Sequence, residues 1–245
     1  MRVPDPFYGF DQHVGIDLGG ARAVFTTRRG GVSRGPFASL NLGRLTEDDR
    51  DAVERNRAAL AERLGVSFAF GRQVHGPDVT RVTAEPDPDA VPAQADGQAT
   101  ALAQIGAMVL TADCLPIAIA GEGAVAMVHA GWRGLAAGVI GEGVRAVREL
   151  GPAGPLSAAI GPGAGPCCYE VGDEVHEAFA DRGDWMRRGR NLDLKAIARA
   201  DLEQAGVGEV HDVGLCTICS ERSLFFSHRR DRGLTGRQAG VAWLS

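Results

Sequence analysis

The sequence predicts a single α/β domain (1–245) of the layered α+β kind, with a mixed β-sheet core flanked by helices. Short apolar runs bounded by turn residues alternate with segments of helical periodicity, the pattern of a layered α/β domain. The 245 residues are 44% hydrophobic and 23% charged, the composition of one ordinary globular domain. A chain of this length buries a sizeable core without disulfide or metal staples.

The strands are predicted from apolar runs and turn signals. Gly19 and Gly20 lie between two strand-like segments, 13–18 and 21–27, which predicts a β-hairpin with a Gly-Gly turn. Further apolar runs predict buried strands; they cover residues 107–111, 115–120, 124–129, 156–160, 210–215 and 239–244.

Helices are predicted where apolar residues recur at helical spacing. Residues 46–64 form the clearest case, because Thr46 with Asp49 resembles a capping box and Gly65 ends the pattern. Residues 134–150 and 192–205 show similar spacing, and an apolar helical face runs through 171–179.

The net charge and the distribution of apolar residues disfavour several classes of function. With 31 acidic and 26 basic side chains the net charge is −5, which disfavours binding of nucleic acid or anionic membranes through bulk charge. The longest apolar stretch, 106–120, is too short to span a bilayer and contains Asp113. The first residues lack the apolar segment of a signal peptide. Together with five cysteines, an odd number, this predicts a cytoplasmic protein with free thiols.

Three segments place reactive side chains at the ends of predicted strands. They are Gln73-Val74-His75-Gly76, Ala112-Asp113-Cys114 and His129-Ala130-Gly131-Trp132-Arg133. Strand ends beside glycine-rich turns are where a rigid sheet presents side chains to a ligand. Two imidazoles and one thiol, those of His75, Cys114 and His129, form a ligand set that suits zinc with an open fourth position. Each residue taken alone also fits an ordinary structural role.

The other four cysteines form a weaker pattern. Cys216 and Cys219 make one C-x-x-C pair, and Cys167 is adjacent to Cys168. A zinc ribbon needs two C-x-x-C pairs, and adjacent cysteines are awkward ligands for a tetrahedral ion. We therefore expect these four to be free thiols buried beneath a sheet.

Arginines cluster in two glycine-rich segments, 26–33 and 225–238. Arginines in such turns, beside serine and threonine, are suited to bidentate binding of phosphate or carboxylate. A run of charge is also typical of a solvated face, so both interpretations stay open.

Eight motifs in order along the chain resemble the YfiH-like family, also called the polyphenol oxidase or laccase-domain family, whose members are now described as purine nucleoside phosphorylases. The motifs are Phe-Thr-Thr-Arg-Arg-Gly-Gly-Val-Ser (25–33), Ser-Leu-Asn-Leu-Gly (39–43), Gln-Val-His-Gly (73–76), Ala-Asp-Cys-Leu-Pro (112–116), His-Ala-Gly-Trp-Arg-Gly (129–134), Ile-Gly-Pro (160–162), Cys-Cys-Tyr-Glu-Val-Gly (167–172) and Phe-Phe-Ser-His-Arg-Arg (225–230). The likeness spans about residues 23–238.

The resemblance implies a YfiH-like fold and a zinc site whose ligands are His75, Cys114 and His129. Members of the family are described as phosphorolysing adenosine, inosine and S-methyl-5′-thioadenosine to the free base and a ribose 1-phosphate, and as deaminating adenosine. The implied partners are therefore purine nucleosides and phosphate. The oligomeric state does not follow from the sequence.

Further site residues are expected around the three ligands. Arg28 and Arg133 are candidates for binding phosphate, and Asn41 and Gln73 for contacting the sugar or base. Asp113 is expected to relay a proton or orient a ligand histidine, or else to cap the turn at the strand end.

Three other functions remain open. A copper-dependent polyphenol oxidase would need many imidazoles. The chain has six histidines and no His-x-His pair. Copper in the zinc site would still allow weak oxidase activity. A metal-free hydrolase would use Cys114 as nucleophile and His129 as base. The last alternative is a domain that binds a ligand or partner without catalysis.

Overall fold

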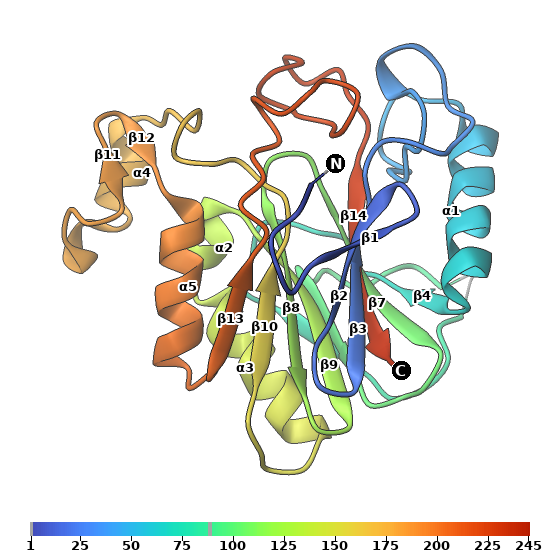
Figure 1. Cartoon of the computed structure of the whole chain (residues 1–245), viewed down its shortest axis with the longest axis horizontal. Helices are drawn as coiled ribbons and strands as arrows, with labels where there is room; N and C mark the ends of the chain where they lie inside the picture. The colour runs from blue at the N-terminus through green and yellow to red at the C-terminus, as the bar shows by residue number, and fades with distance from the viewer. Residues whose placement is uncertain (1, 88–89) are drawn as a thin grey trace.

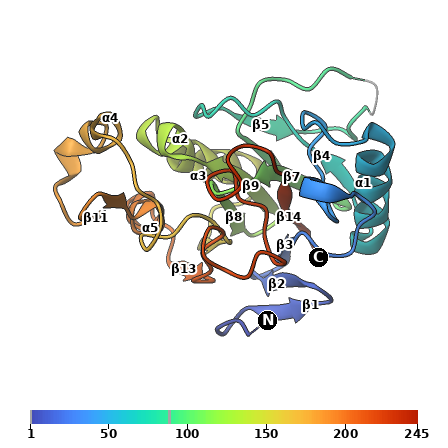
Figure 2. The ribbon, with the colours of Figure 1, turned by 90° about the horizontal axis from the view of Figure 1, so that it is seen from above.

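The structure, a computed structural model, describes residues 2–87 and 90–245. It confirms the mixed α/β fold, but the core is built from two six-stranded sheets packed face to face rather than one. Helices cover both outer faces of this sandwich (Figure 1). Figure 2 shows the same layers from above.

The first sheet contains the predicted hairpin and the C-terminal strand. Its order is β1-β2-β3-β14-β7-β4. β14 pairs antiparallel with both β3 and β7, which joins the two ends of the chain in one sheet. The strands are β1 (Tyr8–Phe10), β2 (His13–Asp17), β3 (Ala21–Phe25), β4 (Ser67–Ala69), β7 (Ile105–Thr111) and β14 (Gln238–Leu244).

The second sheet has the order β13-β10-β8-β9-β6-β5. Its centre is the antiparallel hairpin of β8 and β9, and two parallel pairs form its edges. The strands are β5 (Val79–Val82), β6 (Gly97–Thr100), β8 (Leu115–Gly121), β9 (Ala124–Ala130), β10 (Ser157–Ile160) and β13 (Glu209–Asp212). A small separate ribbon pairs β11 (Arg187–Arg188) with β12 (Asn191–Leu192).

The helices follow the predicted pattern with two differences. The first helix begins later than predicted, because Asp49 rather than Thr46 caps it. The predicted helix 134–150 is two helices, since Gly138 adopts φ 90° between them. The helices are α1 (Arg50–Leu64), α2 (Trp132–Ala136), α3 (Val139–Leu150), α4 (Asp173–Glu177) and α5 (Leu194–Gln204), with 3₁₀ turns at Gly35–Phe37 and Ala180–Arg182.

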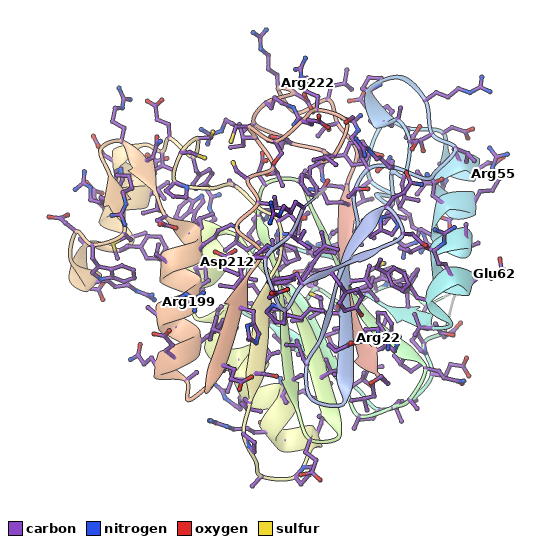
Figure 3. All side chains as sticks on the ribbon, in the orientation of Figure 1. Arg22, Arg55, Glu62, Arg199, Asp212 and Arg222 are labelled. Atoms are coloured by element: carbon purple, nitrogen blue, oxygen red, sulfur yellow. The ribbon has the colours of Figure 1, made fainter. Side chains whose placement is uncertain are left out.

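Three apolar clusters hold the layers together. One lies between the sheets and includes Phe25 and Met127. A second packs α3 and α5 on the outer face of the second sheet, and the third packs α1 on the first sheet through Leu60. The polar face of α1 points to solvent, as Arg55 and Glu62 show (Figure 3). In the described ranges, none of the helices combines the length and apolar character needed to cross a bilayer.

Strand register brings the chemically interesting loops to one edge of the sandwich. The pairings of Gln238 with Thr111, Leu115 with Ala130, and Asp212 with Ile160 show that these strands end at the same end of their sheets. The loops that follow or precede them gather at the top of Figure 1. We call this the loop edge.

Candidate metal centre and adjoining pocket

His75, Cys114 and His129 meet at the loop edge although they come from distant parts of the sequence. Their potential ligand atoms all lie within 4.8 Å of one another. The Cys114 Sγ is 3.8 Å from the His75 Nε2, and the two imidazole rings meet edge to face with centroids 4.8 Å apart. The structure therefore brings together the three residues that the sequence singled out.

The β8–β9 hairpin positions two of the three side chains. His129 lies opposite Pro116, and Ala130 lies opposite Leu115, so Cys114 falls diagonally across from His129 on the same face of the sheet. That face points toward the first sheet, because Met127, two residues before His129, packs in the cluster between the sheets. His75 approaches from the loop before β5, with a left-handed backbone at φ 62°.

Asp96 orients the His129 ring and holds the backbone around His75. Its carboxylate accepts a hydrogen bond from Nδ1 of His129 at 2.7 Å and from the backbone N–H groups of Val74, His75 and Gly76. The side chain is fully buried. Because Nδ1 of His129 is engaged by Asp96, its Nε2 is the nitrogen that is free to bind a metal.

Gly131 leaves space beside the three ligands. A Cβ at this position would lie 3.0 Å from the Cys114 Sγ and 3.0 Å from the His75 Cδ2. Its φ of −84° is open to any residue, so the glycine is required by space and not by backbone conformation. A side chain here would fill the space between the ligand atoms.

The electrostatics favour a thiolate at Cys114. Burial would raise the pKa of this thiol, but the positive charge of His129 and hydrogen bonds from both histidines outweigh burial and lower it to about 6. Burial likewise opposes the charged form of His129, but Cys114 and Asp96 raise its pKa to about 9. Burial also disfavours the Asp96 carboxylate, yet hydrogen bonds from His129, Val74 and Gly76 lower its pKa overall.

The donor set fits a metal ion. A thiolate and two imidazoles are preferred ligands of zinc, and in a tetrahedral site the sulfur and nitrogen ligands are about 3.6 Å apart. The separation of 3.8 Å between Cys114 and His75 is close to that value. Three protein ligands leave a fourth position open for a substrate or water, as in catalytic sites.

The contacts of Asp113 are those of the structural alternative expected for it, an acid that holds the turn at the strand end. Its carboxylate accepts hydrogen bonds from the Thr217 hydroxyl at 2.6 Å and from the Arg229 backbone N–H at 2.7 Å. It thus ties the turn before β8 to the loop between β13 and β14. The orientation of a ligand histidine, which we assigned to Asp113, belongs to Asp96.

Arg28 does not present its guanidinium as a phosphate ligand. The group donates hydrogen bonds to the backbone carbonyls of Pro36, Ala38 and Arg222 and stacks 4.3 Å from the centre of the Phe226 ring. These contacts fix the loops around it and engage the guanidinium with the protein, and phosphate binding at Arg28 stays a prediction.

Asn41 and Gln73 are likewise engaged by the protein. Asn41 is fully buried, and its amide donates to Thr46 and Asp48 and accepts from the Gly43 and Arg237 backbones. Gln73 makes paired hydrogen bonds with the backbone of Leu110, both at 2.8 Å. Both side chains thus make structural contacts, and their contacts with sugar or base stay a prediction.

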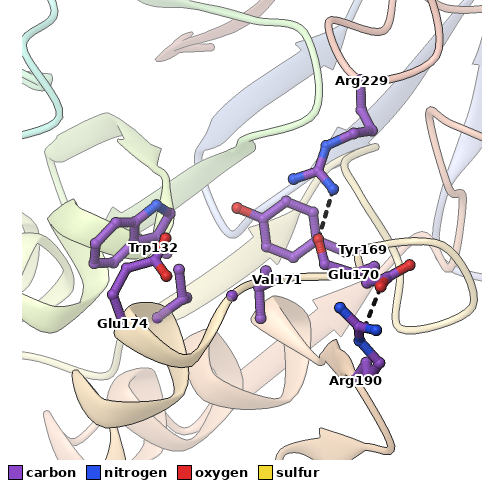
Figure 4. Close-up of a pocket in the computed structure, with 9 residues that line it drawn as sticks. Trp132, Tyr169, Glu170, Val171, Glu174, Arg190 and Arg229 are labelled. Atoms are coloured by element: carbon purple, nitrogen blue, oxygen red, sulfur yellow. Dashed lines mark hydrogen bonds and ion pairs between the residues drawn. The ribbon is translucent and has the colours of Figure 1, made fainter.

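Arg133 remains exposed at the start of α2. Its guanidinium lies 4.2 Å from the centre of the Trp132 ring. Trp132 in turn lines a cavity of about 360 Å³ together with Tyr169, Glu170, Val171, Gly172, Glu174, Val175, Arg190 and Arg229. Figure 4 shows the Tyr169 ring beside the Arg229 guanidinium in this pocket.

The pocket adjoins the candidate metal centre, because Trp132, which lines it, directly follows Gly131 beside the Cys114 and His75 side chains. Burial, followed by the negative charge of nearby Cys114, raises the pKa of Tyr169 to about 12, so its hydroxyl stays protonated and able to donate a hydrogen bond at neutral pH. Arg133 and Arg229 also act on the same phenol through their charges. A polar, arginine-containing pocket therefore lies next to His75, Cys114 and His129.

Comparison with known proteins identifies the family. A family profile described as "Multi-copper polyphenol oxidoreductase laccase" matches residues 22–245. The chain belongs to this laccase-like family. The likeness expected from the eight motifs is thereby confirmed.

Individual relatives are similar to this chain over nearly its whole length. It is 42% identical to a protein of Pseudomonas aeruginosa named purine nucleoside phosphorylase, over 91% of this chain and 93% of that one. An Escherichia coli protein named purine nucleoside phosphorylase YfiH is 39% identical over 92% of this chain and 94% of its own. The crystal structure of YlmD from Geobacillus stearothermophilus superposes with a TM-score of 0.88 at 37% identity, covering 98% of this chain and 99% of that one.

Sequence reasoning missed Asp96. Its only local signal was its place in Ala95-Asp96-Gly97, immediately before a strand. The contacts that matter join it to residues about 20 and 33 positions away, and no local pattern reports them.

The remaining cysteines are free thiols as predicted, but the prediction that they lie buried beneath a sheet was wrong. Cys167 and Cys219 are exposed, Cys168 is half-buried and Cys216 is buried. They lie on loops at the loop edge and not beneath a sheet, and their sulfur atoms are within 4.8 Å of one another.

Proposed function

We propose that the chain is a zinc-dependent purine nucleoside phosphorylase acting on adenosine, inosine and S-methyl-5′-thioadenosine, with adenosine deaminase activity at the same site. The observation that carries the proposal is the convergence of His75, Cys114 and His129 beside a polar pocket. The relatives named purine nucleoside phosphorylase support the substrate class. The free thiols suit a cytoplasmic location.

In this proposal His75, Cys114 and His129 hold the zinc ion, and Asp96 keeps the His129 ring in the ligating orientation. When bound, zinc supplies Lewis acidity that polarises a substrate oxygen or an attacking water. The chain has the ligand chemistry for this ion and an open position for substrate.

The pocket residues bind and orient the two substrates. Arg133 and Arg229 offer guanidinium groups to inorganic phosphate, and Tyr169 donates a hydrogen bond from its protonated hydroxyl. The flat rings of Trp132 and Tyr169 suit a purine base. In phosphorolysis a phosphate oxygen forms a bond to C1′ of the sugar while the C1′–N9 bond breaks, and its electron pair leaves with the base, which takes up a proton.

The oxidase alternative lacks the ligands of a multicopper centre. Besides His75 and His129, the histidines are His13, His176, His211 and His228, and none of these four joins either of the metal-competent clusters found in the described part of the chain. The alternative of a metal-free hydrolase has one supporting observation, since Asp96, His129 and Cys114 also form a thiolate–imidazolium arrangement.

The decisive experiment measures products from adenosine with and without phosphate and chelator. The proposal expects adenine and ribose 1-phosphate only with phosphate, inosine and ammonia without it, and loss of both after chelation. His75→Ala is expected to abolish turnover and metal binding at this centre, whereas His211→Ala, on β13 away from the site, keeps both. Activity that survives chelation identifies the thiol hydrolase instead, and phenol oxidation with bound copper identifies the oxidase.

A further inference from the structure

Four cysteines outside the candidate metal centre form a second cluster. Cys167 and Cys168 belong to the loop after β10, and Cys216 and Cys219 belong to the loop between β13 and β14. Their four sulfur atoms lie within 4.8 Å of one another. We call these residues the four-cysteine cluster.

The spacing of the sulfur atoms is that of a metal site and not of a disulfide. Ligand sulfurs of a tetrahedral zinc site with Zn–S bonds of about 2.3 Å are about 3.8 Å apart. The Sγ atoms of Cys167 and Cys219 are 3.6 Å apart, far beyond the roughly 2.05 Å of an S–S bond. All five cysteines of the chain are free thiols here.

The backbone around Cys216 is arranged to receive a thiolate. The Gly165 N–H donates to the Cys216 Sγ at 3.3 Å. The donor from Gly165 comes from the opposite loop, two residues before Cys167. Backbone N–H groups directed at a ligand sulfur compensate its negative charge and hold its orientation.

We propose that Cys167, Cys168, Cys216 and Cys219 bind a structural zinc ion that joins the two loops. Four thiolates fill all tetrahedral positions, which is the closed arrangement of structural zinc sites and leaves no position for substrate. Soft sulfur ligands select zinc over magnesium, calcium or manganese. Since this ion shares no ligand with the candidate metal centre, the inference does not depend on the proposed function.

The ion stabilises a segment that has little regular structure of its own. The loop between Asp212 and Gln238 contains no helix or strand, and long loops of this kind need additional support. Next to the cluster, Gly163 forms an isolated bridge with Cys216, and the Thr217 N–H donates to the Gly163 carbonyl at 3.0 Å. A zinc ion would reinforce these few contacts between the loops.

An ion in the four-cysteine cluster would also support the turn that carries Cys114. Asp113 accepts hydrogen bonds from Thr217 and Arg229, both in the loop that contains Cys216 and Cys219. The Ala164 N–H, in the loop that contains Cys167 and Cys168, donates to the Asp113 carbonyl at 2.7 Å. The structural ion therefore acts on the candidate metal centre only through the position of this turn.

The experiment counts zinc in the purified protein by elemental analysis. We expect two zinc ions per wild-type chain and one in the double variant His75→Ala/His129→Ala, in which the four-cysteine cluster is intact. X-ray absorption at the zinc edge of that variant should show four sulfur ligands at about 2.3 Å. Cys216→Ser/Cys219→Ser should retain one zinc, bound by nitrogen and sulfur.

Several results would overturn the inference. They are a His75→Ala/His129→Ala protein without zinc, an absorption spectrum with nitrogen ligands in that variant, or intact-mass analysis showing a disulfide within the cluster. If the double serine variant does not fold, the zinc content and spectrum of the histidine variant still decide the question. Loss of the proposed phosphorylase activity would leave this zinc count unchanged.

Discussion

The carboxylate of Asp96 binds His129 through one hydrogen bond of 2.7 Å and at the same time receives three backbone N–H groups of the loop that carries His75. One buried side chain thus orients one ligand of the candidate metal centre and holds in place the backbone of another.

Asp96→Asn should weaken metal binding. The amide keeps the size of the carboxylate but removes its charge and one acceptor, so the His129 ring and the 74–76 backbone lose part of their support. Loss of such a partner costs roughly 10–100-fold in metal affinity. Competition with a chromophoric chelator measures this directly, and Asp17→Asn, at an exposed surface ion pair with Arg22, is the matched control. Equal affinity in the two variants would contradict the role assigned to Asp96.

Gly131→Ala should impair the centre without unfolding the protein. The added Cβ would lie 3.0 Å from the Cys114 sulfur, in space that the ligand atoms share, while the backbone conformation is open to alanine. We expect loss of the metal from this centre and of turnover, with a nearly unchanged Tm. Gly141→Ala on α3 is the control, because nothing lies within 4 Å of its added Cβ, and it should keep the metal and stabilise the helix by about 0.5–1 kcal/mol.

Local sequence signals predicted the individual elements better than their assembly. The Gly19-Gly20 hairpin and the strands β7 to β9 were correctly placed. β5 and β6 were missed, because Val79–Val82 and Gly97–Thr100 lack continuous apolar runs. The division of the strands into two sheets was also missed, since it follows from long-range pairings such as those of β14 with β3 and β7 in the first sheet.

In the candidate site, too, the sequence predicted which residue types matter but not which contacts they make. His75, Cys114 and His129 were identified from their chemistry and their place at strand ends. Arg28 was assigned to phosphate because nothing in its own segment shows that the carbonyls of Ala38 and Arg222 will accept its hydrogen bonds. Such partners are separated from it by up to 194 positions, and only the fold brings them together.

Replacing Arg133 by glutamine should affect phosphate binding, whereas the same change at Arg28 should affect stability. Arg133→Gln removes an exposed guanidinium beside the pocket, so we expect KM for phosphate to rise roughly 10–100-fold, the equivalent of one charge-assisted hydrogen bond. Arg28→Gln removes three hydrogen bonds to backbone carbonyls and should lower Tm instead. Initial rates at varied phosphate and thermal melts of both variants provide the comparison. An unchanged phosphate KM in Arg133→Gln would exclude this residue from the phosphate site.

His13 should make the stability of the fold depend on pH. Burial, reinforced by the positive charge of Arg63, lowers the pKa of His13 to about 4, and its Nδ1 accepts the Thr27 N–H at 3.2 Å. Because the unfolded chain takes up this proton near pH 6.5 and the folded chain does so only near pH 4, the unfolded state binds more protons between these values. Stability is therefore fully present above about pH 6.5 and falls as the pH decreases toward 4, by about 3 kcal/mol for this group. Urea unfolding at pH 7 and pH 4.5 should show a smaller loss in His13→Gln than in the wild type, and parallel losses in the two proteins would show that His13 does not carry the effect.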